Sequence, residues 1–311
     1  MGHGIQVGVV GSAVVAPRDP TGASLEEALH QVTHAALRDA GIAIEDIDGI
    51  VVAGNDQLDG RAITVMMASG SVGGVSRDIL ATPSSAEHAF VLGSLRVRSG
   101  MYNTQLVVSW SPLETEDITE VQRLSADPYY HRALPLDELS AHALQAVALE
   151  NQVPGLREAA VAVTQTNRLH GSRAYPEFAP SPRESVMIQG GRMLRYPITE
   201  GMVSKPAFAV VAMVLASNEW IDQHPGRHTA WVRGMGWATE TAWLGDRNLT
   251  TLPSLQAAAQ QAYTEAGISA PSNAFDVAEV ADATAYQQLL ALEGLGLCPR
   301  TNWVMQSLAA R

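Results

Sequence analysis

The sequence is poor in cysteine, in positive charge and in long apolar runs. Cys298 is the only cysteine among 311 residues, which excludes an intramolecular disulfide and a metal site built from several cysteines. Lys and Arg number 20 against 32 Asp and Glu, so the net charge is −12. The chain therefore lacks the positive charge expected of a partner of nucleic acid or an anionic membrane. The longest apolar run, residues 208–216, is far shorter than the roughly 20 residues of a membrane-spanning helix.

A targeting signal is also missing from the start of the chain. The first residues read MGHGIQVGVVG, with no basic region followed by an apolar stretch, so they do not form a signal peptide. Gln6 stands where a myristoylation signal has Ser or Thr. Together with the single cysteine, this predicts a protein of the reducing cytoplasm, with no membrane attachment.

Apolar residues, in contrast, are plentiful. They make up 46 % of the chain against 17 % charged residues, a mixture typical of a folded protein with a large core and not of a disordered chain. At roughly 100–200 residues per domain, 311 residues indicate two domains or one large duplicated one.

An internal repeat is the most informative pattern. Residues 24–54 read SLEEALHQVTHAALRDAGIAIEDIDGIVVAG, and residues 254–283 read SLQAAAQQAYTEAGISAPSNAFDVAEVADA. Both run from a Ser-Leu helix start through an Ala-rich helix and an Ala-Gly-Ile stop to an Asp and an apolar strand, and a strand precedes each helix. Two such units predict an α/β protein with two sheets covered by helices, a five-layered α/β/α/β/α body.

The segment between the repeats has a different composition. Residues of about 111–206 are enriched in Pro, Tyr, Arg and His, which indicates a large excursion that carries the wall of a cleft. We therefore expect a first half at residues 1–225 that includes this loop domain, and a second, short half at residues 226–311.

The order of these elements resembles the thiolase superfamily, and within it the sterol-carrier-protein-type thiolases. Four stretches carry the resemblance, at residues 35–54, 148–176, 195–217 and 275–299. It implies the duplicated thiolase-like fold with an inserted loop domain, and a coenzyme A thioester as substrate. No covalently bound cofactor and no metal site are implied.

The sequence lacks the catalytic residues of this family. The family places a nucleophilic cysteine at the N-terminus of the helix after the third strand, where the helix lowers the thiol pKa. Here that segment reads ATPSSAEHA, with Pro83 in place of the cysteine. The histidine of a second family motif is replaced by Ala281. Two later motifs would lie beyond Cys298, which is why we expect a shortened second half.

Several residues remain candidates for chemistry. Ser84 and Ser85 are either oxyanion donors and weak nucleophiles or simply the cap of a helix. His88 follows Ser84 by four residues, so it is either a general base for Ser84 or a polar surface residue. Asp282 is either a base at a strand end or a helix cap, and Tyr286 either offers a phenol to the same cleft or belongs to the core.

Four arginines of the loop domain are candidate ligands for the phosphates of coenzyme A, although solvated loop charges are the alternative. They are Arg168, Arg173, Arg192 and Arg195. His30 and His34 have metal-ligand spacing on one helix, but no third ligand accompanies them, which favours a solvated helix face.

The resemblance implies a subunit of an acyl-CoA-processing complex in lipid, steroid or secondary metabolism. Some thiolase-like proteins without the cysteine act as aldolases with a small zinc-ribbon and OB-fold partner. Aldol or retro-aldol chemistry needs a base and an oxyanion site but no thiolate, so it is the expected reaction. A homodimer, or a heteromer with a thiolase or with that small partner, is expected. The alternative is a non-catalytic pseudo-thiolase that scaffolds an active subunit.

Overall fold

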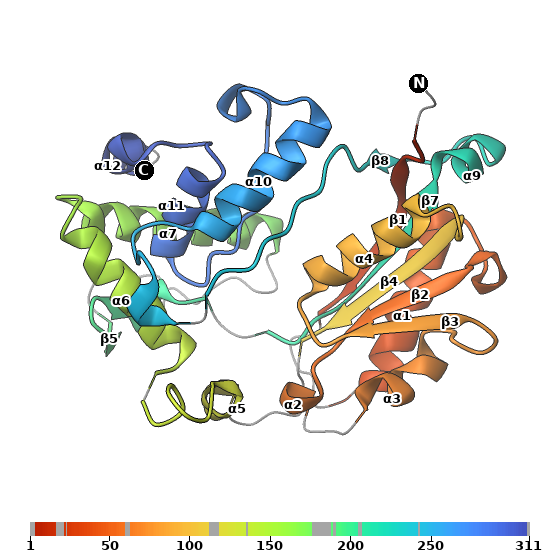
Figure 1. Ribbon diagram of the computed structural model, residues 1–311, viewed down its shortest axis with the longest axis horizontal. Coiled ribbons are helices and arrows are strands. Elements are labelled where there is room, and N and C mark those ends of the chain that lie inside the picture. Colours follow the sequence, from red (N-terminus) through yellow and green to blue (C-terminus); the bar gives the residue numbers. More distant parts are fainter. Residues whose placement is uncertain are drawn as a thin grey trace. The chain divides into compact units, whose positions relative to one another are not determined.

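The computed structural model describes residues 4–16, 22, 24–59, 63–111, 118–134, 136–175, 188, 191–204, 207–241 and 243–309. The chain divides into two compact units, labelled by their elements in Figure 1. Unit 1 comprises Met1–Ser125 and Pro206–Val232, and unit 2 comprises Ala126–Lys205 and Arg233–Arg311. Among the described helices, none combines the length and the apolar character that crossing a membrane requires.

Unit 1 is built on a six-stranded mixed sheet in the order β3-β2-β4-β7-β1-β8. The strands are β1 (Val7–Val15), β2 (Gly49–Ala53), β3 (Asp78–Thr82), β4 (Thr104–Trp110), β7 (Val210–Ser217) and β8 (Ala230–Trp231). β2 runs parallel to β3 and β4, whereas β7 runs antiparallel to β4 and β1. The helices are α1 (Leu25–Ala40), η2 (Ile44–Asp46), α2 (Asp56–Asp59), α3 (Thr64–Ser71), α4 (Ala86–Arg98), α5 (Ile118–Ser125) and α9 (Asn218–Gln223).

Both faces of this sheet are covered by helices. Successive side chains of a strand point to opposite faces. Ile50 and Val52 of β2 therefore join the core under α1, while Val51 joins the core under α4. Ala89 of α4 is fully buried in that second core. The sheet thus fixes where α4 begins, directly after the edge strand β3.

The first copy of the repeat folds as its sequence predicts. Ser24 and Glu27 form a reciprocal capping box at the start of α1, with each side chain bonded to the other residue's backbone N–H. Gly41 ends α1 in the left-handed conformation, at a φ of 64°. In the second copy Gly267 ends α10 in the same way, at a φ of 71°.

Unit 2 is mainly helical. Its helices are α6 (Glu138–Glu150), α7 (Leu156–Ala174), η4 (Glu200–Met202), η5 (Leu244–Asp246), α10 (Pro253–Ala266), η6 (Pro271–Asn273), α11 (Ala285–Gly294), η7 (Arg300–Asn302) and α12 (Trp303–Ala309). The strands β5 (Met193–Arg195) and β6 (Ile198–Thr199) form a two-stranded sheet. A core that includes Leu149, Leu156, Tyr286, Leu290 and Trp303 holds α6, α7, α11 and α12 together.

The second copy of the repeat departs from expectation at its strands and its helix start. Only Ala230–Trp231 of the first expected strand is a strand, and it pairs with β1 of unit 1. The next residues lie along α10, and Met235 and Trp237 donate their backbone N–H groups to the side chains of Glu265 and Gln261. Because α10 side chains take these bonds, no strand ladder forms there.

The strand expected before Ala281 is likewise absent from the described structure, since residues 276–280 have no regular secondary structure and are mostly exposed. Unit 2 therefore contains the β5–β6 pair, and no larger sheet among its described residues. At the start of α10, Ser254 is not the cap, because Leu252 holds that position and Pro253 begins the helix. The Ser254 hydroxyl bonds instead to Glu240.

Candidate functional site

At the start of α4, two serine hydroxyls contact the same histidine side chain. β3 ends at Thr82, Pro83 follows, and Ser85 occupies the N-cap position of α4. The Oγ of Ser84 lies 2.9 Å from Nδ1 of His88, and the Oγ of Ser85 lies 3.2 Å from the same nitrogen. All three side chains are exposed. The structure thus unites the three candidate residues that the sequence places at this helix start.

The N-cap side chain of α4 contacts His88 and does not bond to the helix backbone. Ser85 thus has the position of a helix cap, as the cap alternative anticipates, but its side chain makes no capping hydrogen bond to the first turn of α4. Uncapped N–H groups at a helix start carry partial positive charge and stabilise an anion. A base within hydrogen-bond reach of a hydroxyl, beside such N–H groups, is suited to proton abstraction with oxyanion stabilisation.

Asp282 lies in the other unit, just before α11. Its exposed carboxylate accepts a hydrogen bond of 3.0 Å from Nδ2 of Asn167, which lies on α7. The same amide nitrogen also donates to Oε1 of Gln288. The helix-cap alternative is not observed, because Thr284 holds the N-cap position of α11. Asn167 and Gln288 are contacts that sequence spacing did not reveal.

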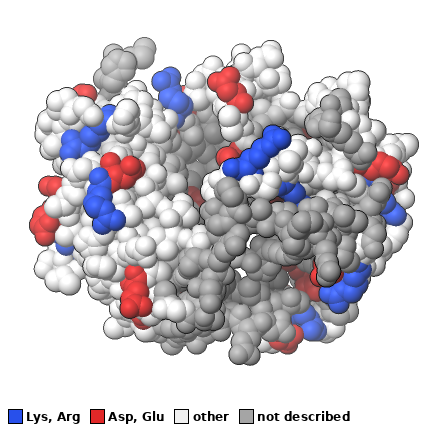
Figure 2. All heavy atoms as spheres, turned by 180° about the vertical axis from the view of Figure 1, so that it is seen from behind, with Lys and Arg blue, Asp and Glu red and all other residues white. Residues whose placement is uncertain are grey.

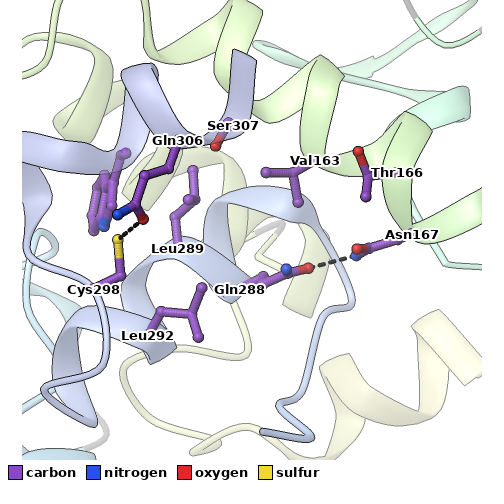
Figure 3. Close-up of a pocket in the computed structure, with 10 residues that line it drawn as sticks. Val163, Thr166, Asn167, Gln288, Leu289, Leu292, Cys298, Gln306 and Ser307 are labelled. Atoms are coloured by element: carbon purple, nitrogen blue, oxygen red, sulfur yellow. Dashed lines mark hydrogen bonds between the residues drawn. The ribbon is translucent and has the colours of Figure 1, made fainter. Parts of the chain in front are cut away.

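These amides border a pocket of about 170 Å³ between α7, α11 and α12 (Figure 3). Val163, Leu289 and Leu292 supply apolar wall. The polar side chains of the described lining carry amide, hydroxyl, thiol or indole groups and no formal charge. The pocket is therefore suited to a small neutral molecule.

The single thiol lines this pocket but is held in its neutral form. Cys298 is half-buried, and its Sγ donates to Oε1 of Gln306 at 2.9 Å. Burial, with the nearby carboxylate of Glu293, raises the pKa of the Cys298 thiol. A protonated thiol is a poor nucleophile and a poor metal ligand.

Tyr286 is the buried end of a hydrogen-bond network within unit 2. Its side chain is 1 % exposed, and its phenol donates to Oε1 of Glu150 at 2.6 Å. Arg157 donates two hydrogen bonds to the same carboxylate, at 2.7 and 3.0 Å, and one to the hydroxyl of Tyr196 at 2.7 Å. Burial and the contact with Glu150 raise the pKa of Tyr286. The phenol thus faces a carboxylate in the core, as the core alternative for Tyr286 anticipates.

We expect Tyr286→Phe to lower the free energy of unfolding by about 1.5–2 kcal/mol near neutral pH, since a buried bond to a charged acceptor is lost. The raised folded-state pKa means that the phenol's contribution is fully present below about pH 10, the ordinary value, and is lost as the pH rises above it. Urea unfolding at pH 8 and pH 10.5 checks both points. The variant should lose less stability on alkalinisation than the native protein does, with exposed Tyr129→Phe as control; equal losses would contradict the assignment.

The four candidate arginines are placed differently from one another. Arg168 donates to the backbone carbonyl of Gly201, and Arg195 donates to Ser140 and Asp137. Arg192 is 74 % exposed and lies 3.8 Å from the carboxylate of Glu200. Arg173 is exposed in the last turn of α7. On the face shown in Figure 2, basic side chains of the described residues alternate with acidic ones and form no continuous basic patch.

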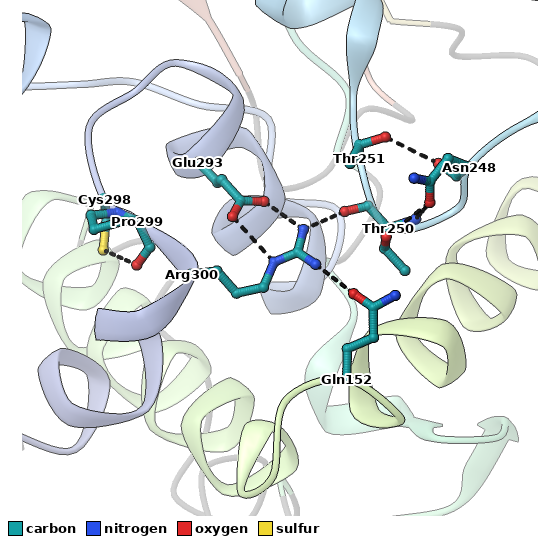
Figure 4. Close-up of polar contacts among 8 residues, drawn as sticks. All are labelled: Gln152, Asn248, Thr250, Thr251, Glu293, Cys298, Pro299 and Arg300. Carbon is teal, nitrogen blue, oxygen red and sulfur yellow. Dashed lines mark hydrogen bonds and ion pairs between the residues drawn. The ribbon is translucent and has the colours of Figure 1, made fainter.

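One further arginine has a clear structural role that the sequence did not signal. Arg300 donates to both carboxylate oxygens of Glu293 at 2.6 and 3.1 Å, to Oε1 of Gln152 at 2.6 Å, and to the backbone carbonyl of Thr250 (Figure 4). Its guanidinium also lies over the ring of Trp303, 5.2 Å from the centroid. These contacts fix the start of α12 and the Cys298–Pro299 turn beside the pocket.

Comparisons with known proteins agree with this fold. Residues 236–304 match the family model described as Thiolase C-terminal domain-like. A solved structure described as "Ltp2-ChsH2(DUF35) aldolase" aligns with a TM-score of 0.78 and 16 % identity, covering 98 % of this chain and 80 % of that one. A monomeric SCP2-thiolase like protein type 1 from Mycobacterium smegmatis aligns with a TM-score of 0.70 and 16 % identity, covering 94 % of this chain.

The chain spans 63 % of that second protein. No curated protein matches the sequence. The structural matches show a thiolase-like fold, and the family model identifies residues 236–304 as thiolase-like in sequence. The predicted α/β fold class and the resemblance to the thiolase superfamily are confirmed. The second large sheet of the expected five-layered α/β/α/β/α body is not found among the described residues.

Proposed function

We propose that the chain is a thiolase-like subunit that makes or breaks a carbon–carbon bond of a coenzyme A thioester by aldol or retro-aldol chemistry. One observation carries the proposal: the helix start where the resembling family has its cysteine instead holds Pro83 and two serine hydroxyls that converge on His88. This arrangement has a base and oxyanion donors but no thiolate. A fold shared with a protein described as an aldolase supports the reaction class.

In the retro-aldol direction, His88 takes the proton of the β-hydroxyl group of a β-hydroxyacyl thioester. The bond between the α and β carbons breaks, and the β carbon leaves as a ketone or aldehyde. The electron pair of the broken bond stays with the α carbon and forms the thioester enolate. The first-turn N–H groups of α4 and a serine hydroxyl stabilise the enolate oxygen. The imidazolium then returns its proton to the α carbon. No oxidant, reductant or metal is required.

The proposed substrate class and partner rest on the resemblance. Arg173 and Arg192, the exposed members of the arginine set, are available to coenzyme A phosphates. The structurally similar aldolase is named after two components, Ltp2 and ChsH2(DUF35). This two-component name supports a heteromeric complex, and we propose the small zinc-ribbon and OB-fold subunit as the partner of this chain.

A second candidate is the pseudo-thiolase scaffold. Three candidate site residues, Tyr286, Arg168 and Arg195, form internal hydrogen bonds, and this favours structural roles for them. In this case the chain stabilises an active thiolase subunit and has no turnover of its own.

An assay of the purified protein with its copurifying partners separates these two functions. A panel of β-hydroxyacyl-CoA esters is incubated with the protein, and the acyl-CoA and carbonyl products are quantified by mass spectrometry. The proposed function predicts equimolar release of both products. Turnover that depends only on an added intact thiolase, with none from this chain and its partner, would support the scaffold instead.

The Asp282→Asn variant tests whether Asp282 or His88 is the base of the proposed reaction. We expect this variant to keep its turnover within about twofold of native, because the exposed carboxylate contacts the Asn167 amide and the proposed base is His88. The amide retains an oxygen that accepts the same hydrogen bond, so the variant isolates the loss of basicity. A drop of about 10²-fold or more in this variant, with full activity in His88→Gln, would assign the base to Asp282.

A further inference from the structure

The pocket between α7, α11 and α12 contains a buried hydrogen-bond donor with no acceptor. Trp303, the first residue of α12, lines the pocket and is 0 % exposed. Its indole Nε1 is buried and has no hydrogen-bond partner among the described residues. A buried donor without a partner costs free energy, and an acceptor delivered by a ligand recovers it.

The rest of the wall defines the character of such a ligand. Val163, Leu289 and Leu292 favour an apolar body. The described lining contains no Asp, Glu, Lys, Arg or His, so a charged ligand would be desolvated without a counter-charge. The side chains of Asn167 and Gln288 lie at the same wall and bond to each other (Figure 3).

We propose that this pocket binds a small neutral carbonyl compound, a ketone, ester or amide, whose oxygen accepts the indole N–H of Trp303. A volume of about 170 Å³ suits six to eight non-hydrogen atoms, since cavities of roughly 150 Å³ hold a benzene-sized molecule. Because Trp303 has no solvent exposure, a lining side chain has to move for a ligand to reach the indole. We expect Gln306 to be that side chain, since it lines the pocket, is exposed, and is held by the hydrogen bond from Cys298.

This site lies wholly in unit 2 and shares no residue with the helix start of α4. Binding here therefore does not depend on the proposed function, and either one can fail without the other.

The test uses the whole protein labelled with ¹⁵N at its tryptophan indoles. Cyclopentanone and methylcyclopentane, two probes of equal heavy-atom number, are titrated separately and the indole N–H signals are followed by NMR. We expect one indole signal, assigned to Trp303 by its loss in Trp303→Phe, to shift saturably with cyclopentanone. Cyclopentanone should move the Trp303 indole proton signal downfield, as a newly formed hydrogen bond does, whereas methylcyclopentane has no acceptor and should not. No saturable shift with cyclopentanone, or the same downfield shift with both probes, would overturn the proposal.

Two variants complete the test. Leu292→Phe enlarges a half-buried wall residue and should abolish the saturable shift, whereas Leu308→Phe on the exposed side of α12 should leave it unchanged. Native binding in Leu292→Phe would contradict the location of the site. Should Trp303→Phe fail to fold, the comparison of the two probes on the native protein and the Leu292→Phe result still decide the question.

Discussion

Replacing His88 by Gln is expected to lower kcat for retro-aldol cleavage by about 10²–10⁴-fold, the usual contribution of a positioned general base. A glutamine side chain retains hydrogen-bonding groups for Ser84, but it does not take up a proton at neutral pH. KM should change little, because in the proposed reaction the imidazole acts on the proton of the β-hydroxyl group and does not hold the coenzyme. Steady-state kinetics at pH 7–8 measure the effect.

The matched control is His34→Gln, which changes an exposed helical histidine of the same unit and should leave kcat unchanged. Ser84→Ala removes one of the two hydroxyls on the imidazole and should give a smaller loss than His88→Gln, because Ser85 still contacts Nδ1. A His88→Gln protein that folds normally and turns over at the native rate would remove the imidazole from the reaction.

Introducing a methyl group at Gly236 or Gly11 is expected to destabilise the protein by about 3 kcal/mol or more, at the upper end of overpacking costs. A Cβ at Gly236 would lie 1.9 Å from the carbonyl oxygen of Ala258 on α10. A Cβ at Gly11 would lie 2.6 Å from the carbonyl oxygen of Ala36 on α1. In both copies of the repeat, the segment before the Ala-rich helix thus lies directly against the backbone of that helix. The clash cannot be relieved by rotating a side chain, because the position of a Cβ is fixed by the backbone and the carbonyl oxygen that it meets is itself backbone.

Urea unfolding of Gly11→Ala and Gly236→Ala checks this expectation. The control is Gly70→Ala on α3, where a Cβ meets no atom of the described residues within 4 Å. There the substitution should stabilise the helix by roughly 0.5–1 kcal/mol, because alanine loses less backbone entropy than glycine. Native-like stability of Gly236→Ala would mean that the segment after β8 does not lie against α10.

Local chemistry made much of the fold predictable from the sequence. The Ser24 capping box, the left-handed glycines at Gly41 and Gly267, and the apolar strands of unit 1 all act over a few neighbouring residues. The pairing of Ser84 with His88 was also readable, because a separation of four residues places both groups on one side of a helix start.

Long-range contacts were not predictable in this way. Asn167 and Asp282 are 115 residues apart, and Tyr286 and Glu150 are 136 apart, so no spacing rule links them. The segment after β8 has a strand-like sequence, but Glu265 and Gln261 of α10 accept the backbone N–H groups that a neighbouring strand would have accepted. A strand forms only where a partner strand is present, and the sequence of one segment does not reveal its partner.

Deuterium incorporation at the α carbon of propionyl-CoA in D₂O tests the central claim most directly, because it reports enolate formation without knowledge of the carbonyl partner. The account predicts exchange by the native protein assayed with any copurifying partner, undiminished exchange in Cys298→Ala, and loss of exchange in His88→Gln. Absence of exchange in the native sample, or its disappearance when the only sulfhydryl of the chain is removed, would contradict carbanion chemistry at the start of α4.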